Sequence, residues 1–253
     1  MGANIAKRVI GVILRPEYNA QVFSYLGREA LRIVLPSWCV ACESELPWDD
    51  RTASCCGACW SSMAKLNGPK CRSCALPVPA GELCIACTLE PLPVDWCDAW
   101  GAYAGALEKL LYALKFQRHD FLDDALATLL EETLRDREFD FVAGVPMHAA
   151  KERKRGYNQA ELLARALSRR IGVACDMRLL KRKAAGAAQS TLPKRDRAAN
   201  VRGAFAASPR AKGKSILIVD DICTTGETLR ACASALQAEG ASRVCVIAVA
   251  KAV

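Results

Sequence analysis

From about residue 98 onward, apolar residues alternate between helical spacing and short continuous runs. A run such as Ser215–Val219 is typical of a strand buried in the middle of a parallel sheet. Strands that alternate with helices predict an α/β domain with a mainly parallel sheet. The spacing predicts helices at Leu107–Leu114, Phe121–Leu134, Gln159–Arg170 and Gly226–Ala238, and strands at Phe139–Val145, Ser215–Val219 and Val244–Val249.

The first 97 residues follow a different pattern. Residues 1–36 have apolar groups at roughly helical spacing up to Pro36, which predicts an amphipathic helical lead-in, packed on the chain or lying on a membrane surface. Residues 37–97 lack regular periodicity and hold ten of the 14 cysteines. They predict a small module held by something other than a hydrophobic core. The predicted domains are therefore 1–36, 37–97 and 98–253.

Composition narrows the class of protein. Of the 253 residues, 52% are hydrophobic and 25% are charged, which is ordinary for a soluble globular chain. The apolar run after Lys7 and Arg8 is too short for a secretory signal, and no segment is long and apolar enough to span a membrane. We therefore expect a cytoplasmic protein, and in that reducing compartment clustered cysteines are metal ligands more often than disulfides.

Eight cysteines form four Cys-x-x-Cys pairs. A two-residue spacer lets both sulfurs of a pair face one ion, and two pairs complete a tetrahedral zinc site. Joining neighbouring pairs predicts two structural zinc ions. Cys55 is adjacent to Cys56 and is an alternative ligand in that position. The predicted ligands are Cys39, Cys42, Cys56 and Cys59 for one ion, and Cys71, Cys74, Cys84 and Cys87 for the other.

Positive charge is concentrated in one block. Between Lys151 and Arg202 there are 15 Lys/Arg and 4 Asp/Glu, a balance of +11 in a chain whose net charge is +8. Such a block indicates phosphate-bearing ligands or nucleic acid. A solvated basic surface is the plainer alternative.

The most specific local pattern is an apolar strand that runs into two acids, a Thr/Gly loop and a helix, over Ile216–Leu229. Backbone N–H groups at the start of that helix lack helical partners and favour an anion. Asp220 and Asp221 end the strand, where open α/β sheets bind ligands, and their oxygens suit ribose hydroxyls and Mg²⁺. The alternative is an ordinary strand, loop and helix with a threonine at the N-cap.

These residues resemble the signature by which type I phosphoribosyltransferases bind 5-phosphoribosyl-1-pyrophosphate (PRPP). The segments Val145–Ala160 and Gln189–Phe205 resemble those of the ComF family. The paired cysteines are similar to the double zinc ribbon that precedes the transferase-like domain in that family. The resemblance covers about residues 30 to 250. It implies a mainly parallel α/β sheet of the type I phosphoribosyltransferase type, preceded by a small cysteine-rich double zinc ribbon.

The resemblance also implies roles for individual residues. Asp220 and Asp221 would contact ribose and Mg²⁺, and the following loop would hold the 5-phosphate through Thr224, Thr225, Gly226, Glu227 and Thr228. The residues expected near the pyrophosphate are His148, Lys151, Arg153, Arg155, Asn158 and Gln159. A mobile loop over the site would carry Arg182, Gln189, Arg197 and Asn200.

Two functions are compatible with these residues. The first is an enzyme that binds PRPP with Mg²⁺ and transfers the phosphoribosyl group to an acceptor that nothing in the sequence marks. The second is a non-catalytic PRPP or nucleotide sensor that contacts single-stranded DNA, or proteins of competence and DNA uptake. Aromatic residues make up 6% of the chain and the basic block contains only Tyr157, which favours contact with the DNA backbone over reading of bases.

Overall fold

The structure, a computed structural model, describes residues 38–46, 54–80, 82–117, 119–135, 138–183 and 203–253. The chain divides into two compact units between Ser61 and Ser62. The predicted helical lead-in lies outside the described residues, and the predicted domain boundaries stay a prediction. Among the described residues, no helix is long and apolar enough to cross a membrane.

The described part of the smaller unit is built from turns and one short helix, α3 (Gly57–Ser61). Trp38 pairs with Glu45 in an isolated antiparallel bridge. The backbone N–H of Val40 donates to the carbonyl of Ser54 at 2.8 Å, which joins the two stretches of chain that carry its cysteine pairs.

The larger unit is centred on a four-stranded sheet in the order β1-β6-β5-β2, and every neighbouring pair is parallel. This confirms the predicted fold class. Strands β5 and β6 occupy the middle and are buried along most of their length, as their continuous apolar runs require. The strands are β1 (Trp96–Ala102), β2 (Phe141–Gly144), β5 (Ser215–Cys223) and β6 (Arg243–Lys251).

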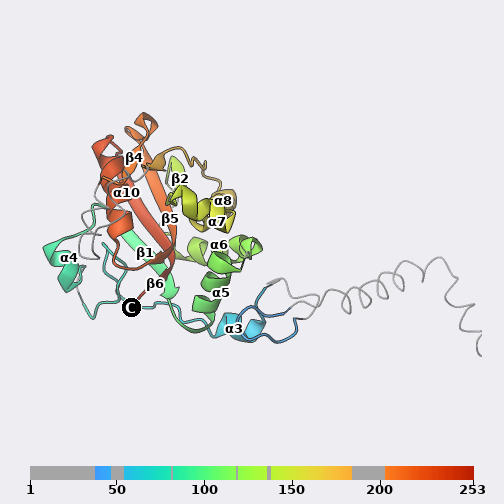
Figure 1. Ribbon diagram of the computed structural model, residues 1–253. Coiled ribbons are helices and arrows are strands. Elements are labelled where there is room, and N and C mark those ends of the chain that lie inside the picture. Colours follow the sequence, from blue (N-terminus) through green and yellow to red (C-terminus); the bar gives the residue numbers. More distant parts are fainter. Residues whose placement is uncertain (1–37, 47–53, 81, 118, 136–137, 184–202) are drawn as a thin grey trace, which may run out of the picture. The chain divides into compact units, whose positions relative to one another are not determined.

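Helices cover both faces of this sheet. Helices α6 and α8 pack on each other and against the sheet, and Figure 1 shows α10 on the opposite side. A two-stranded antiparallel hairpin of β3 (Leu180–Arg182) and β4 (Phe205–Ala207) packs against α10. The helices are α4 (Ile85–Leu89), α5 (Gly105–Phe116), α6 (Asp123–Thr133), α7 (Ala149–Arg155), α8 (Gln159–Ile171) and α10 (Glu227–Ala238), with 3-10 turns η1 (Asp120–Leu122) and η4 (Pro209–Ala211).

Local sequence signals explain where α8 begins and how closely it packs. The Asn158 side chain accepts from the N–H of Ala160 at 3.1 Å as the N-cap, and Gly172 ends the helix in the left-handed conformation. A Cβ on Gly144 would lie 2.7 Å from the carbonyl oxygen of Ala160. Only glycine therefore lets β2 approach α8 this closely. Gly144 is the last residue of β2, so this contact positions the strand end beside the candidate site.

Candidate functional site

A pocket of about 320 Å³ lies beside the carboxyl ends of β2 and β5. Segments far apart in the sequence meet there: the end of α5, the turn after β2, the start of α8, the end of β3, and β5 with the first turn of α10. Open parallel sheets bind ligands at this edge. The pocket is lined by Lys115, Phe116, Val145, Pro146, Met147, His148, Lys151, Arg155, Asn158, Gln159, Arg182, Asp220, Asp221 and Thr228.

The two acids of the pocket have different environments. Asp221 is 3% exposed, and one of its carboxylate oxygens lies 2.7 Å from the amine of Lys115. Burial, with the neighbouring charge of Asp221, raises the pKa of Asp220 well above its ordinary value. An approaching cation or a hydroxyl donor would offset this cost, because both favour the charged carboxylate.

Positive and polar groups line the rest of the pocket. Lys151 and Arg155 come from α7, and the guanidinium of Arg155 donates to the side-chain carbonyl of Gln159. His148 caps α7, since its Nδ1 accepts from the N–H of Ala150 at 3.2 Å. The side-chain amide of Asn158 donates to the carbonyl of Val145 at 2.9 Å, which ties the start of α8 to the turn after β2.

The Thr/Gly loop follows β5 and begins α10. Thr224 and Thr225 are exposed, and Gly226 is the N-cap with φ +81°. The buried amine of Lys251, at the end of β6, donates to the backbone carbonyls of Cys223 and Thr224. The Lys251 amine thus holds the backbone of the loop, and the exposed hydroxyl groups of Thr224 and Thr225 can face solvent or a ligand.

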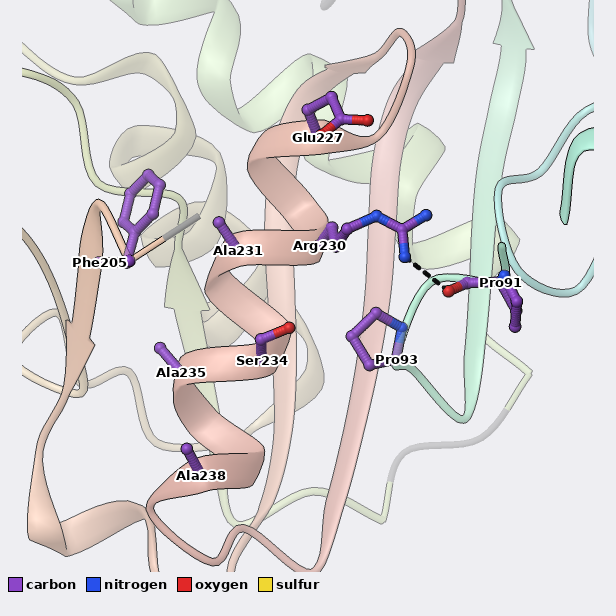
Figure 2. A pocket seen from close by; sticks show the side chains of 10 residues that line it. Pro91, Pro93, Phe205, Glu227, Arg230, Ala231, Ser234, Ala235 and Ala238 are labelled. Atoms are coloured by element: carbon purple, nitrogen blue, oxygen red, sulfur yellow. Dashed lines mark hydrogen bonds between the residues drawn. The ribbon is translucent and has the colours of Figure 1, made fainter. Parts of the chain in front are cut away.

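The structure brings nine of the predicted site residues to one pocket. Arg153 is exposed and does not line it, and neither do Thr224, Thr225 and Gly226 of the loop before α10. Glu227 lines a separate pocket of about 570 Å³ beside α10 (Figure 2). Of the predicted mobile loop, Arg182 lies at the end of β3 and lines the pocket at the ends of β2 and β5. Gln189, Arg197 and Asn200 lie outside the described residues.

Five lining residues of the pocket were not predicted as site residues: Val145, Pro146 and Met147 in the turn after β2, and two residues from α5. Lys115 and Phe116 come from the end of α5, more than a hundred positions before the acids, and no spacing connects them to β5. They also line an adjoining pocket of about 390 Å³ with Lys151, Lys154 and Arg155. The guanidinium of Arg155 lies over the ring of Phe116, 5.2 Å from its centroid.

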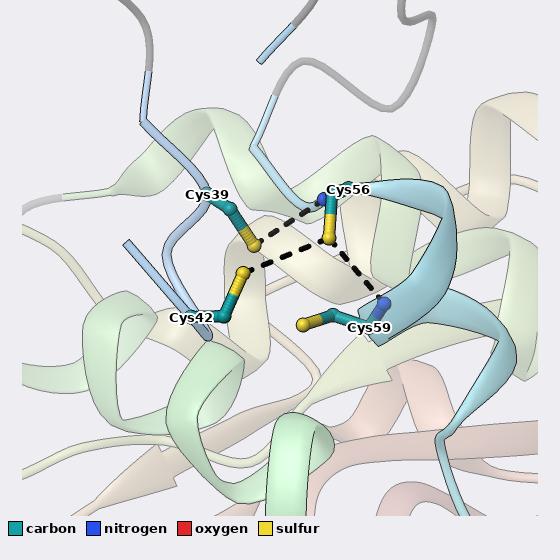
Figure 3. A group of neighbouring side chains, drawn as sticks. All are labelled: Cys39, Cys42, Cys56 and Cys59. Carbon is teal, nitrogen blue, oxygen red and sulfur yellow. Dashed lines mark hydrogen bonds between the residues drawn. The ribbon is translucent and has the colours of Figure 1, made fainter. Parts of the chain in front are cut away.

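The first cysteine group gathers Cys39, Cys42, Cys56 and Cys59, all with sulfurs within 4.8 Å of one another. Figure 3 shows the four side chains pointing toward a common centre. The sulfurs of Cys42 and Cys56 are 3.7 Å apart. Cys55 lies outside this group, and burial raises its pKa to about 12. The geometry therefore favours Cys56 over Cys55 as the ligand.

The second group gathers Cys71, Cys74, Cys84 and Cys87 within the same limit, and all four are buried. The sulfurs of Cys74 and Cys84 are 3.7 Å apart. A tetrahedral zinc ion with Zn–S distances of about 2.3 Å separates its sulfurs by about 3.8 Å. Both groups fit structural zinc, which confirms the predicted pairing of neighbouring Cys-x-x-Cys pairs.

Comparison with known families agrees with both halves of this description. A phosphoribosyl transferase domain matches residues 119–252, and a double zinc ribbon domain matches residues 30–88. The first of these covers more than half of the chain.

Curated relatives match along most of their length. The DNA utilization protein YhgH of Escherichia coli O6:H1 is 33% identical over 197 residues, which cover 75% of this chain and 86% of the relative. Competence protein F of Haemophilus influenzae is 26% identical, with 89% and 95% covered. Competence protein ComFC of Bacillus subtilis is 27% identical, with 73% and 78% covered. The chain, a double zinc ribbon joined to a phosphoribosyl transferase domain, belongs to the ComF family.

Proposed function

We propose that this protein binds PRPP with Mg²⁺ in the pocket at the ends of β2 and β5, and that the reaction it supports is phosphoribosyl transfer to an acceptor. The observation that carries the proposal is that Asp220 and Asp221 line the same pocket as four cationic side chains. The cations are Lys115, Lys151, Arg155 and Arg182. PRPP needs this combination, because its ribose hydroxyls require acceptors and its phosphates require positive charge.

The electrostatics of the acid pair support a bound metal. Asp220 is desolvated next to another carboxylate, and Lys115 already compensates Asp221. A divalent cation near Asp220 would stabilise the ionised pair, and it would also neutralise charge on a departing pyrophosphate. The exposed Thr224 and Thr225 and the N-terminal amides of α10 would receive the 5-phosphate.

The test is isothermal titration of PRPP in the presence of Mg²⁺. Asp220→Asn combined with Asp221→Asn should abolish measurable binding. Asp124→Asn is the matched control, because this acid lies on α6 with a side chain that is 64% exposed. Unchanged affinity in the double variant would exclude the pocket. Pyrophosphate release across a panel of acceptors then separates catalysis from binding alone.

A second candidate function is binding of single-stranded DNA, and a specific surface favours it. The rings of Tyr112 and Phe116 contact each other on α5, 4.9 Å between centroids, and their side chains are 50% and 61% exposed. Phe116 borders the adjoining pocket with Lys151 and Lys154. Bases stack on exposed rings, and flanking cations hold the backbone. The relatives' names, competence and DNA utilization, favour a role connected with DNA. We propose that this role is cytoplasmic, with DNA-uptake proteins as partners.

Fluorescence anisotropy of a labelled oligonucleotide across a salt series tests this second function. Tyr112→Ala with Phe116→Ala should weaken binding without changing the salt dependence. Lys151→Ala with Lys154→Ala should reduce the slope of affinity against salt by about two. Phe121→Ala is the control, as another aromatic side chain that is 54% exposed. Absence of binding at low salt would remove this candidate.

A further inference from the structure

The four cysteines of the second group pack with Val78 and Leu92 in one buried hydrophobic cluster. The backbone N–H of Leu92 donates to the hydroxyl of Ser73 at 2.7 Å, and Ser73 lies between Cys71 and Cys74. The position of Leu92 is therefore set by the cysteine turn at residues 71–74.

Leu92 in turn packs on the Thr/Gly loop at residues 223–230, which we call the ligand loop. A Cβ on Gly226 would lie 3.1 and 3.2 Å from the two methyl groups of Leu92. Gly226 separates the exposed threonines from α10, whose first turn carries Thr228 at the ligand pocket. The Leu92 side chain therefore supports the loop at Gly226.

Two hydrogen-bonded contacts join the same segment to either side of Gly226. The thiol of Cys223, at the end of β5, donates to the carbonyl of Cys74 at 3.5 Å. The guanidinium of Arg230, on α10, donates to the carbonyl of Pro91 at 2.7 Å (Figure 2). It also donates to the carbonyl of Glu90 at 2.8 Å. The loop at residues 223–230 is thus fixed at three points, one at the zinc ligand Cys74 and two in residues 90–92, which follow the last ligand.

We propose that zinc at Cys71, Cys74, Cys84 and Cys87 holds this loop in its ligand-binding form, so that zinc and the phosphoribosyl ligand each strengthen binding of the other. The proposal rests on the proposed function for its ligand. A structural zinc site folds the chain that supplies its ligands, and loss of the ion would release Ser73, Leu92 and Cys74 from their positions. Coupling between two binding sites is reciprocal by thermodynamic necessity.

The reciprocal effect can be measured without changing the second site. Zinc affinity is measured by equilibrium competition with a chromogenic chelator in Cys39→Ser/Cys42→Ser protein, which keeps the second group intact, with Mg²⁺ alone or with Mg²⁺ and PRPP. We expect PRPP to tighten zinc binding by about 5-fold to 150-fold, the usual range of coupling between sites. In Cys84→Ser/Cys87→Ser protein, which keeps only the first group, PRPP should leave the zinc affinity unchanged. Equal affinities with and without PRPP in the first variant, in protein that binds PRPP, would overturn the proposal.

A second measurement needs no PRPP and so separates failure of this proposal from failure of the proposed function. Hydrogen exchange of the amides at residues 224–230 is compared between the two cysteine variants and Leu92→Ala. Cys84→Ser/Cys87→Ser and Leu92→Ala should speed exchange at least tenfold, and Cys39→Ser/Cys42→Ser should not. Leu92→Ala keeps every zinc ligand, so a faster loop in this variant cannot be assigned to loss of metal. If exchange at residues 224–230 is unchanged in Cys84→Ser/Cys87→Ser and in Leu92→Ala, the coupling is overturned even if PRPP binds.

Discussion

The two cysteine groups share the same ligand chemistry but differ in what surrounds them. Of the first group, Cys42 is exposed and Cys56 and Cys59 are half-buried. The second group is buried throughout and belongs to a hydrophobic cluster with Val78 and Leu92. A metal site enclosed by apolar side chains contributes to the stability of everything that packs on it, whereas a partly exposed site chiefly holds its own turns together.

The two groups have one feature of their thiols in common. Burial opposes ionisation of Cys39 and of Cys71, but hydrogen bonds from backbone N–H groups outweigh it in both. They lower the pKa of Cys39 to about 6 and that of Cys71 to about 7. Each group thus contains one thiol whose backbone hydrogen bonds favour the thiolate form that binds zinc.

The largest expected effect is on the stability of the larger unit. Cys84→Ser/Cys87→Ser should lower its unfolding temperature by on the order of 10 °C, because about 3 kcal/mol of stability corresponds to a shift of that size in a domain of this length. Cys39→Ser/Cys42→Ser should shift it by less than about 2 °C. Differential scanning calorimetry of zinc-loaded protein measures both, and equal shifts would remove the distinction between the groups.

The contact between Leu92 and Gly226 gives a smaller and more local test. Gly226→Ala places a methyl group against Leu92 in a left-handed backbone, and should cost about 2 kcal/mol of unfolding free energy. Gly172→Ala is the matched control, since its φ is +71° but no atom lies within 4 Å of the added carbon, and it should cost about 1 kcal/mol.

A double-mutant cycle completes that test. Leu92→Ala should recover part of the loss caused by Gly226→Ala, with a coupling of at least about 0.5 kcal/mol by urea unfolding. The same Leu92→Ala change combined with Gly172→Ala should be additive. Additivity in both cycles would show that Leu92 does not confine the loop.

Zinc release in the absence of ligand should differ between the two groups by about tenfold in rate. The first group has exposed sulfur, and release requires only local opening of turns, whereas the second must open part of a buried cluster. Wild-type protein should therefore release zinc to a chelator in two phases of equal amplitude, and each double cysteine variant should keep one of them. A single phase in wild type would contradict the comparison.

Features encoded by neighbouring residues could be predicted from sequence. The strand, acid pair, loop and helix over residues 215–238 were predicted, and the structure has them as β5 and α10. Strand β5 is four residues longer than predicted and contains the acid pair, because its pairing with β6 continues to Cys223. The cysteine pairing was predicted for the same reason, because a two-residue spacer fixes the geometry of each pair. In both cases the information lies within one turn or one strand.

Features that depend on tertiary pairing were missed. Strand β1 contains Asp98 and Gly101 and has no long apolar run, so only its pairing with β6 reveals it. Helix α7 is seven residues long and mostly charged, too short for a periodic signal. The role of Lys115 in the pocket is seen only in its ion pair with Asp221. Leu92 lies in a proline-rich stretch, and its role is seen only in its contact with Gly226.

The smallest expected effect concerns the charge of Asp220, in β5, rather than the support of the loop that follows it. Burial beside Asp221 raises the pKa of Asp220 above 3.8, so the folded protein keeps a proton that the unfolded chain releases. Stability must then fall as the pH rises from about 4 toward the raised pKa, because the folded state binds more protons there. Asp220→Asn cannot ionise, so its unfolding free energy should match wild type near pH 4 and exceed it increasingly toward pH 8. Urea unfolding across this range, with Asp124→Asn as the control, measures the divergence. A difference in unfolding free energy that stays constant with pH would mean that Asp220 ionises in the folded protein at no cost in stability. The pocket would then lack the uncompensated carboxylate that favours a metal-bound ligand.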